Sequence, residues 1–218
     1  MRIHEIFKSI EGEGKRAGQI ATFVRAYGCT CACTYCDTTY ACEGGEYTNW
    51  TIDEIVKCVE QLGAPRVTFT GGEPLMQEDS VELIDQLTRL GYEVNIETNG
   101  SIDLVCLKNV EHQDKVIVTM DYKSISSGMS EEMIEGNLDY LGPEDAVKFV
   151  VGTKDDLDQM RSIVERNPQF KGTFFVSPVF EQIELVDIAK YLLDNNLTQV
   201  KMQVQLHKII WPADMRGV

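Results

Sequence analysis

Short hydrophobic runs recur along the chain, and amphipathic stretches separate most of them. The runs are rich in Val, Ile, Thr and Phe and are bounded by Gly, Asn or Asp, which is typical of β-strands. They predict seven strands, at residues 21–28, 66–72, 92–100, 115–123, 145–152, 173–179 and 200–208.

Four of the intervening stretches have the spacing of amphipathic helices. Residues 51–63 begin at Thr51 and carry Glu54 three positions later, a capping box that marks a helix start. The other predicted helices lie at residues 79–91, 154–168 and 181–196. Between the third and fourth strands the helical signal is weak.

The alternation of strands and helices predicts a mostly parallel sheet with helices packed against it. A closed eight-fold barrel needs about 250 residues, whereas this chain has 218. We therefore expect an α/β fold, an open, partial (β/α) barrel, formed by a single domain over residues 1–218. In such folds ligands bind at the carboxyl ends of the strands.

Composition narrows the class of protein. The formal net charge of −15 is opposite to that of nucleic-acid binders, which need a basic surface, so no nucleic-acid partner is expected. No apolar run approaches the length of a membrane span, and residues 1–14 lack the apolar core of a signal peptide. We expect a cytoplasmic protein with no membrane partner and a small substrate.

Polar or thiol side chains follow most predicted strands. The sequence GGEP comes after the second strand, ETNG after the third, DYKS after the fourth, and the last strand runs into LHKIIWP. A segment with five of the chain's seven cysteines follows the first strand. Because these strand ends meet at one edge of the sheet, the pattern predicts one composite site.

Within this segment, Cys29, Cys33 and Cys36 form C-x3-C-x2-C. An odd number of clustered cysteines does not fit a secreted disulfide framework. Three thiolates on one loop suit three corners of an iron–sulfur cluster and leave one iron open. A zinc site with Cys31 as fourth ligand, or a disulfide or soft-metal patch, stays open on spacing alone. Cys42 is either a spare thiol or a neighbour of this loop.

C-x3-C-x2-C with Tyr35 before the last cysteine, followed by GGEP at residues 71–74, resembles the radical S-adenosylmethionine (SAM) superfamily. Several further segments are similar to the 7-carboxy-7-deazaguanine synthase family, which makes the deazapurine ring of queuosine. They are EIFKSIEGEG, FVRAYGC, CDTTY, ETNG and LHKIIWPADMRGV. The resemblance runs from residue 5 to the carboxyl end, with little that is diagnostic between residues 124 and 200.

The resemblance implies that Cys29, Cys33 and Cys36 hold a [4Fe–4S] cluster whose open iron binds SAM. One electron then yields a 5′-deoxyadenosyl radical. The cofactor-binding residues it implies are Tyr35, Gly72, Glu73, Gly100, Asp121, Tyr122 and Lys123. Lys123 is expected to pair either with the SAM carboxylate or with Asp121, and the alternative for Glu73 is a solvated turn.

The resemblance also implies the substrate 6-carboxy-5,6,7,8-tetrahydropterin, with Arg25 gripping its carboxylate in a bidentate fork. The alternative for Arg25 is an ion pair with Glu11 or Glu13. The other substrate-binding residues implied are Ile10, Glu11, Gly12, Thr98, His207 and the terminal carboxylate of Val218. Thr38 is implied as a Mg²⁺ ligand. The family usually has Gln where Glu11 stands.

The resulting hypothesis is a radical SAM lyase that converts the pterin acid to 7-carboxy-7-deazaguanine and ammonia, with no side chain named as catalytic. A flavodoxin-type electron donor and a homodimer, the commonest symmetric oligomer, are the expected partners. Two alternatives are a glycyl-radical-activating enzyme, which acts on a protein, and a non-catalytic iron–sulfur or zinc protein.

Overall fold

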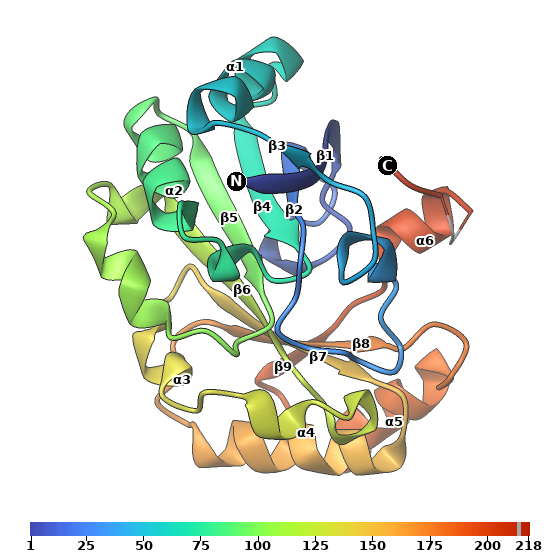
Figure 1. Ribbon diagram of the computed structural model, residues 1–218. Coiled ribbons are helices and arrows are strands. Elements are labelled where there is room, and N and C mark those ends of the chain that lie inside the picture. Colours follow the sequence, from blue (N-terminus) through green and yellow to red (C-terminus); the bar gives the residue numbers. More distant parts are fainter. Residues whose placement is uncertain (213–214) are drawn as a thin grey trace.

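The computed structural model describes residues 1–212 and 215–218. Its centre is one nine-stranded sheet in the order β3-β1-β2-β4-β5-β6-β7-β8-β9 (Figure 1). The strands are β1 (Arg2–Ile10), β2 (Ile20–Ala26), β3 (Thr48–Asn49), β4 (Arg66–Gly71), β5 (Glu93–Thr98), β6 (Val116–Tyr122), β7 (Ala146–Val151), β8 (Thr173–Pro178) and β9 (Val200–Met202). Every neighbouring pair from β2 to β9 is parallel. The predicted open, mostly parallel α/β sheet is confirmed.

Helices follow most of the parallel strands. They are α1 (Ile52–Leu62), α2 (Ser80–Arg89), α3 (Asn137–Tyr140), α4 (Lys154–Arg166), α5 (Leu185–Asp194) and α6 (Leu206–Ile210). The capping box of α1 is present, because Thr51 accepts a hydrogen bond from the Glu54 N–H and the Glu54 carboxylate accepts one from Thr51 N–H at 2.8 Å. The weak helical stretch before β6 forms only the 3-10 turns η4 (Leu104–Asn109) and η5 (Gln113–Lys115).

The sequence prediction missed β1 and β3, which pair with the sheet in antiparallel orientation. In β1, RIHEIFKSI, polar and apolar residues do not alternate regularly, and the register is irregular between Ile3 and Glu5. Its period-two hydrophobic signal is therefore weak. The predicted strand at 200–208 was too long. Only Val200–Met202 pairs with β8, and the chain turns into α6 at Leu206.

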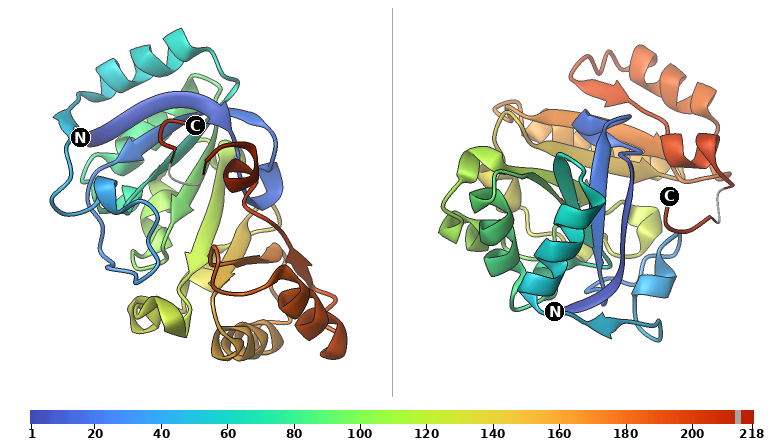
Figure 2. Two further views of the ribbon diagram at one scale, coloured as in Figure 1. Left: turned by 90° about the vertical axis from the view of Figure 1, so that its right-hand side faces the viewer. Right: turned by 90° about the horizontal axis from the view of Figure 1, so that it is seen from above.

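The sheet curves into an incomplete barrel (Figure 2). Its open side is bridged where the β1–β2 loop meets the segment after β9. Leu206 N–H donates to the Gly12 carbonyl at 3.0 Å, and Gly14 N–H donates to Gln203 Oε1 at 2.8 Å. These bonds bring the beginning and the end of the chain together at the interior of the barrel.

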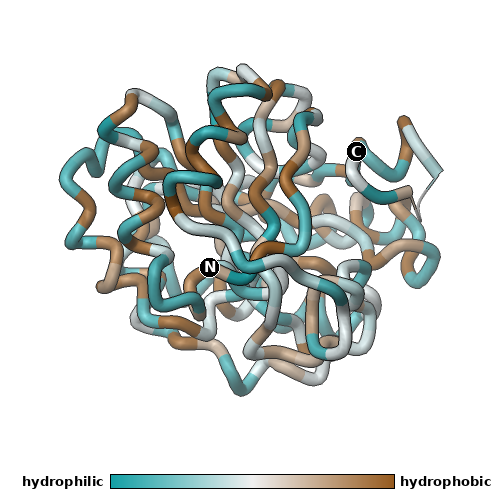
Figure 3. Tube along the Cα trace, turned by 45° about the horizontal axis from the view of Figure 1, so that its top comes forward, coloured by the Kyte–Doolittle hydropathy of each residue, from teal (hydrophilic) through white to brown (hydrophobic). Residues whose placement is uncertain are grey.

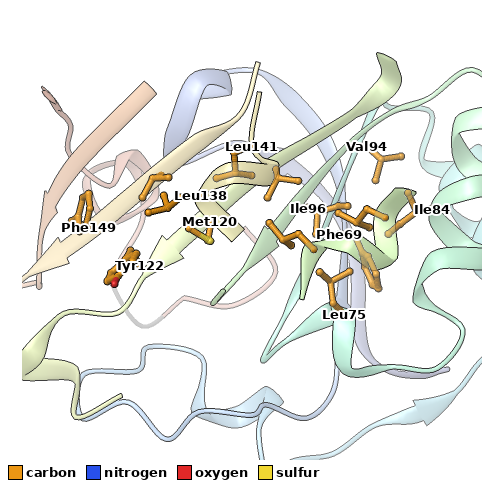
Figure 4. Close-up of a cluster of buried hydrophobic side chains, with 14 of the residues drawn as sticks. Phe69, Leu75, Ile84, Val94, Ile96, Met120, Tyr122, Leu138, Leu141 and Phe149 are labelled. Carbon is orange, nitrogen blue, oxygen red and sulfur yellow. The ribbon is translucent and has the colours of Figure 1, made fainter. Parts of the chain in front are cut away.

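The hydrophobic core lies between the sheet and the helices that cover its convex face. Figure 4 shows Phe69, Ile96 and Met120 from neighbouring strands packed with helix and loop residues such as Ile84 and Leu75. In the coiled parts of the trace, hydrophobic and hydrophilic residues alternate over short distances (Figure 3), as is typical of amphipathic helices. The core thus fixes the strands whose carboxyl ends carry the polar site.

In the described part of the chain, no helix has the length and apolar character needed to cross a membrane.

Candidate active site

A cavity of about 550 Å³ opens at the carboxyl ends of the parallel strands, a size typical of small-molecule sites. It gathers residues from β1, β2, the cysteine loop, β4 to β7 and the carboxyl-terminal segment. Among the residues predicted from the sequence, the cavity is lined by Ile10, Glu11, Gly12, Arg25, Cys29, Cys33, Tyr35, Cys36, Thr38, Gly72, Thr98, Asp121, Lys123, His207 and Val218.

The three predicted cluster ligands face this cavity together. Cys29, Cys33 and Cys36 are partly buried, free thiols. The Cys31 N–H donates to Cys29 Sγ at 3.4 Å, and Asn99 Nδ2 approaches the same sulfur at 3.6 Å. Donors aimed at a sulfur favour its thiolate form, which is the form that binds metals.

The cysteine loop is anchored to the segment that follows β6. Thr34 N–H donates to the Ser127 carbonyl at 3.1 Å, and Thr34 Oγ1 donates to the Ser126 carbonyl at 2.7 Å. The hydroxyls of Tyr35 and Ser124 are 2.9 Å apart. The cysteine loop is therefore fixed at Thr34 and Tyr35 by the segment that follows β6.

Cys42 lies beside the predicted ligands. Of the two alternatives for this residue, a spare thiol or a neighbour of the cysteine loop, the structure supports the neighbour. Hydrogen bonds from Cys42 lower the pKa of Cys29 to about 6 and of Cys36 to about 7, and the Lys123 ammonium contributes to both shifts. The Cys42 thiol keeps its proton, because its two neighbours raise its pKa. Two of the three predicted ligands are thus poised to ionise near neutral pH.

The GGEP segment fixes the position of the first cysteine. A Cβ at Gly72 would lie 2.2 Å from the Gly28 carbonyl oxygen and 2.7 Å from the Cys29 Cβ. Glu73 N–H donates to the same Gly28 carbonyl at 2.8 Å. Only glycine permits this approach, so the β4 end serves as a support for the cysteine loop.

Glu73 lies behind the cavity wall, with its side chain fully buried. Its carboxylate accepts hydrogen bonds from Leu75 N–H at 3.0 Å, Thr98 Oγ1 at 3.0 Å and Asn99 N–H at 2.7 Å. Burial raises its pKa to about 7 despite these donors. Glu73 therefore joins the ends of β4 and β5, and the wall beside it is the backbone of Gly71 and Gly72.

Gly100 and Tyr122, two more of the predicted cofactor residues, also stand outside the cavity lining. Gly100 has φ +76°, and a Cβ there would lie 3.0 Å from the Met120 sulfur. The Tyr122 ring belongs to the core, 5.5 Å from the Phe149 ring centre. Their predicted contacts with SAM stay predictions.

Asp121 and Lys123 form an ion pair at 3.0 Å inside the cavity. The second carboxylate oxygen of Asp121 is buried and has no protein partner among the described residues. Burial lowers the Lys123 pKa, but the Asp121 charge outweighs this effect and holds the ammonium protonated. A free acceptor beside a fixed cation suits a zwitterionic ligand with an amino and a carboxylate group.

Arg25 forms its ion pair with Glu5, whose Oε1 accepts from Arg25 Nε at 2.7 Å. The alternative of a pair with Glu11 or Glu13 is wrong, since Glu11 makes no salt bridge among the described residues and Glu13 binds Lys148 at 2.8 Å. Arg25 still lines the cavity. One edge of its guanidinium is thus fixed, and the rest stays available to an anion.

Sequence reasoning missed Lys148 and Glu97 as cavity residues. Lys148 is the one charged residue in the fully buried run of β7, AVKFVV, which was the available signal. Burial raises the pKa of Glu13, but the Lys148 ammonium outweighs burial and lowers it. The two charges therefore balance each other. Glu97 forms no salt bridge within the described residues, and burial raises its pKa although the Lys148 charge opposes this shift. Glu13 Oε1 is also buried without a partner in the described chain.

The carboxyl-terminal segment covers the rim of the cavity. His207 packs on Gly12, where a Cβ would come within 2.1 Å of His207 Nδ1. Arg216 lies over the Tyr40 ring at 4.2 Å, and Val218, the terminal residue, lines the cavity. The β1–β2 loop and the carboxyl-terminal segment therefore share the same site.

Thr38 lies beside Asp37, to which its hydroxyl donates at 3.0 Å. The Lys208 ammonium binds the other Asp37 oxygen at 2.9 Å. About half of the Asp37 side chain is exposed. Partial desolvation in the cavity raises the Asp37 pKa, but the Lys208 charge outweighs this effect and lowers the pKa to about 2. This oxygen-rich corner adjoins the cysteine loop and fits the ligand preference of Mg²⁺.

Comparison with known proteins agrees with this geometry. The model of the Radical SAM superfamily matches residues 23–166. The 7-carboxy-7-deazaguanine synthase of Clostridium acetobutylicum is 40% identical over all of this chain and 99% of its own length. That of Methanospirillum hungatei is 39% identical over 96% of this chain and 85% of its own.

The fold also matches a solved structure. The crystal structure of QueE from Escherichia coli superposes with a TM-score of 0.74 over 93% of each chain, at 22% sequence identity. At that identity the likeness supports the architecture alone.

Proposed function

The chain belongs to the radical SAM superfamily and, within it, to the 7-carboxy-7-deazaguanine synthase family, and we propose that it converts 6-carboxy-5,6,7,8-tetrahydropterin to 7-carboxy-7-deazaguanine with loss of ammonia. The observation that carries this proposal is one cavity that joins Cys29, Cys33 and Cys36 to a free-edged Arg25 and to unpaired acidic acceptors. It offers a place for the cluster, for SAM and for a flat anionic substrate together.

Cys29, Cys33 and Cys36 would hold the [4Fe–4S] cluster. The lowered pKa values of Cys29 and Cys36 suit thiolate ligation, whereas the hydrogen bond of Cys33 to Cys31 raises the Cys33 pKa, so Cys33 would lose its proton to the metal. The cluster and SAM, when bound, supply a 5′-deoxyadenosyl radical that removes a hydrogen atom from C6 of the pterin. Asp121 and Lys123 would bind the amino and carboxylate groups of SAM. Gly71 and Gly72 would let SAM approach the strand end closely.

We assign the substrate carboxylate to Arg25, which lies on β2 and lines the same cavity as Lys123. The guanidinium, held by Glu5 through Nε, presents its remaining N–H groups as a fork. Glu13 and Glu97 would accept the N–H groups of the amino-pyrimidinone edge. This division gives the carboxylate end and the donor edge of the ring separate partners in the cavity.

Substrate and product differ by ammonia alone, so the hydrogen atom taken from C6 must be balanced by one returned to the ring later in the reaction. With that return the conversion needs no net oxidant or reductant. The protein's task is to hold the ring while it contracts and to keep water out of the reaction. We assign no side chain as a dedicated base.

The Thr38–Asp37 corner is our assignment for Mg²⁺, which would keep water and substrate oxygens as its other ligands. This assignment rests on the exposed hydroxyl and carboxylate, which lie close to the cysteine loop that faces the substrate. Enzyme treated with chelator should recover activity with Mg²⁺ and lose substrate affinity without it.

We further propose a flavodoxin-type protein as electron donor, a homodimeric assembly and a cytoplasmic location for a single working domain. The free thiols and the strongly acidic surface motivate the location and the absence of a nucleic-acid partner. Sedimentation analysis of the cluster-loaded protein tests the assembly.

The proposed function is tested by anaerobic turnover of the reconstituted enzyme with SAM, a chemical reductant and the pterin acid. We expect 7-carboxy-7-deazaguanine and ammonia in equal amounts, and strong stimulation of SAM cleavage by the pterin. SAM cleavage that ignores the pterin would contradict the proposal. It would favour the glycyl-radical-activating alternative, against which the full-length match to synthases already speaks.

A further inference from the structure

Glu11 is a buried carboxyl group in the floor of the cavity, with 1% of its surface exposed. Its backbone is fixed on both sides, because its N–H donates to the Gln19 carbonyl and its carbonyl accepts from Gly18 N–H, both at 2.8 Å. The side chain of Glu11 points into the barrel. There, the Thr68 hydroxyl donates to Glu11 Oε1.

The groups that face Glu11 do not balance a negative charge. From β4 it meets the neutral Thr68, and from β5 it meets the neutral Asn95 and the acidic Glu97. The Arg16 charge, from the turn after β1, has only a small lowering effect on the Glu11 pKa, and Arg16 Nε is bound to Glu93 at 2.6 Å. Among the described residues Glu11 has no salt bridge.

The other charged groups of the floor are already matched. The Lys148 ammonium forms a salt bridge with Glu13 at 2.8 Å, so Glu13 is its counter-ion. Burial, and then the neighbouring Glu97, raise the pKa of Glu11 to about 8. A carboxyl group that is buried without a counter-ion keeps its proton at neutral pH.

We propose that Glu11 is a positioning residue that stays protonated in the working enzyme, and that its hydroxyl donates a hydrogen bond to the ring carbonyl of the bound pterin. Thr68 donates to Oε1, and the Asn95 side chain is a second hydrogen-bond neighbour of the carboxyl group. We assign the proton to Oε2, the oxygen that Thr68 does not contact. In an amino-pyrimidinone the ring carbonyl is adjacent to the N–H that Glu97 would accept. The ring carbonyl would thus accept from Glu11, and the adjacent ring N–H would donate to Glu97.

The assignment rests on the proposed function and gives the site a pH limit. When Glu11 loses its proton, the donor disappears and a second anion faces Glu97 and the anionic substrate. Binding should therefore weaken by about tenfold per pH unit above the pKa of Glu11, since one proton is then required for binding. Below that pKa the affinity should be level.

The test is the dissociation constant of 6-carboxytetrahydropterin, measured anaerobically by calorimetry between pH 6 and pH 9.5 on cluster-loaded, SAM-bound, unreduced enzyme. Glu11→Gln, which has a donor and an acceptor but no titrating proton, should remove the alkaline loss of affinity. Glu11→Ala should bind about tenfold more weakly at pH 7, without that alkaline loss. Glu78→Gln, at an exposed carboxylate, is the matched control and should keep the wild-type profile.

A second variant guards against a folding defect in the first. The Thr68 hydroxyl lowers the Glu11 pKa, so Thr68→Val should move the loss of affinity to higher pH and Thr68→Ser should restore it. An unchanged alkaline loss in Glu11→Gln, or a flat wild-type profile, would overturn the Glu11 assignment alone. Wild-type enzyme that does not bind the pterin at pH 7 would instead overturn the proposed function.

Discussion

Arg25 and Glu5 face each other across the β1–β2 ladder, and Arg25 Nε donates to Glu5 Oε1 at 2.7 Å. The cation also lies over the Phe7 and Tyr40 rings, at 5.8 and 5.9 Å. A guanidinium held by one carboxylate and two rings has lost its freedom before substrate arrives. The antiparallel strand that sequence reasoning missed thus prepares the anion site.

We expect Arg25→Lys to weaken binding of the pterin acid by about ten- to a hundredfold, because an ammonium cannot form the bidentate fork. Glu5→Gln, which keeps a hydrogen-bond acceptor, should cost less than Arg25→Lys. Calorimetry with unreduced enzyme measures both effects. SAM affinity is the internal control, and an equal loss of SAM binding would show that Arg25 does not act on the substrate.

The cluster should depend on three cysteines and not on their neighbours. Ser in place of Cys29, Cys33 or Cys36 should abolish iron and sulfide incorporation, whereas Cys31→Ser and Cys42→Ser should retain the cluster. Iron and acid-labile sulfide per chain, with the spectrum of the reduced cluster, provide the measurement. Loss of the cluster in Cys31→Ser would revive a four-cysteine site.

Glu73→Ala should destabilise the protein rather than remove a single cofactor contact. The buried N–H groups of Leu75 and Asn99 would lose their acceptor, which costs about 1–3 kcal/mol for each group. We expect a lower melting temperature in the absence of SAM. A variant with unchanged melting temperature but weaker SAM binding would instead assign Glu73 to direct cofactor recognition.

The raised pKa of Glu11 should make the stability of the folded protein depend on pH. Between the ordinary pKa of 4.5 and the raised value of about 8, the unfolded chain has ionised Glu11 while the folded chain keeps the proton. Stability therefore falls by about 1.4 kcal/mol per pH unit as pH rises through this window. The melting temperature of Glu11→Gln relative to wild type should rise from pH 5 to pH 8, and parallel curves would contradict this.

The carboxyl-terminal tail should contribute to substrate affinity through Tyr40. Arg216 lies 4.2 Å from the centre of the Tyr40 ring, a cation–π contact that holds the last residues over the cavity. Tyr40→Phe should keep substrate affinity, whereas Tyr40→Leu or removal of Gly217 and Val218 should raise KM. An unchanged KM after that truncation would exclude a role for the terminal carboxylate.

The sequence predicted those parts of the site that depend on local spacing. The cysteine loop, the glycines of GGEP and the strands with continuous apolar runs were all correctly located. The Glu13–Lys148 pair was not, since its partners are 135 positions apart and only the folded barrel brings them together. The partner of Arg25 was missed for a different reason. Glu5 lies on β1, and a strand rich in charged residues gave little hydrophobic signal.

Long-range packing also separated residues that a motif had grouped. GGEP placed Glu73 with the glycines, but the fold turns its carboxylate inward to β5 and leaves backbone at the cavity. DYK likewise grouped Tyr122 with Asp121 and Lys123. Since side chains alternate along a strand, Tyr122 points to the core while its two neighbours point to the cavity.

The central claim is that this cavity sets the C6 hydrogen of a pterin acid against the SAM-derived radical. The most direct measurement is anaerobic turnover of 6-carboxytetrahydropterin deuterated at C6, with mass analysis of both products. We predict deuterium in the 5′-deoxyadenosyl group, found in 5′-deoxyadenosine or in SAM re-formed when a hydrogen atom is returned to the ring, together with formation of 7-carboxy-7-deazaguanine. Cleavage of SAM that leaves 5′-deoxyadenosine unlabelled and the pterin intact would contradict the account.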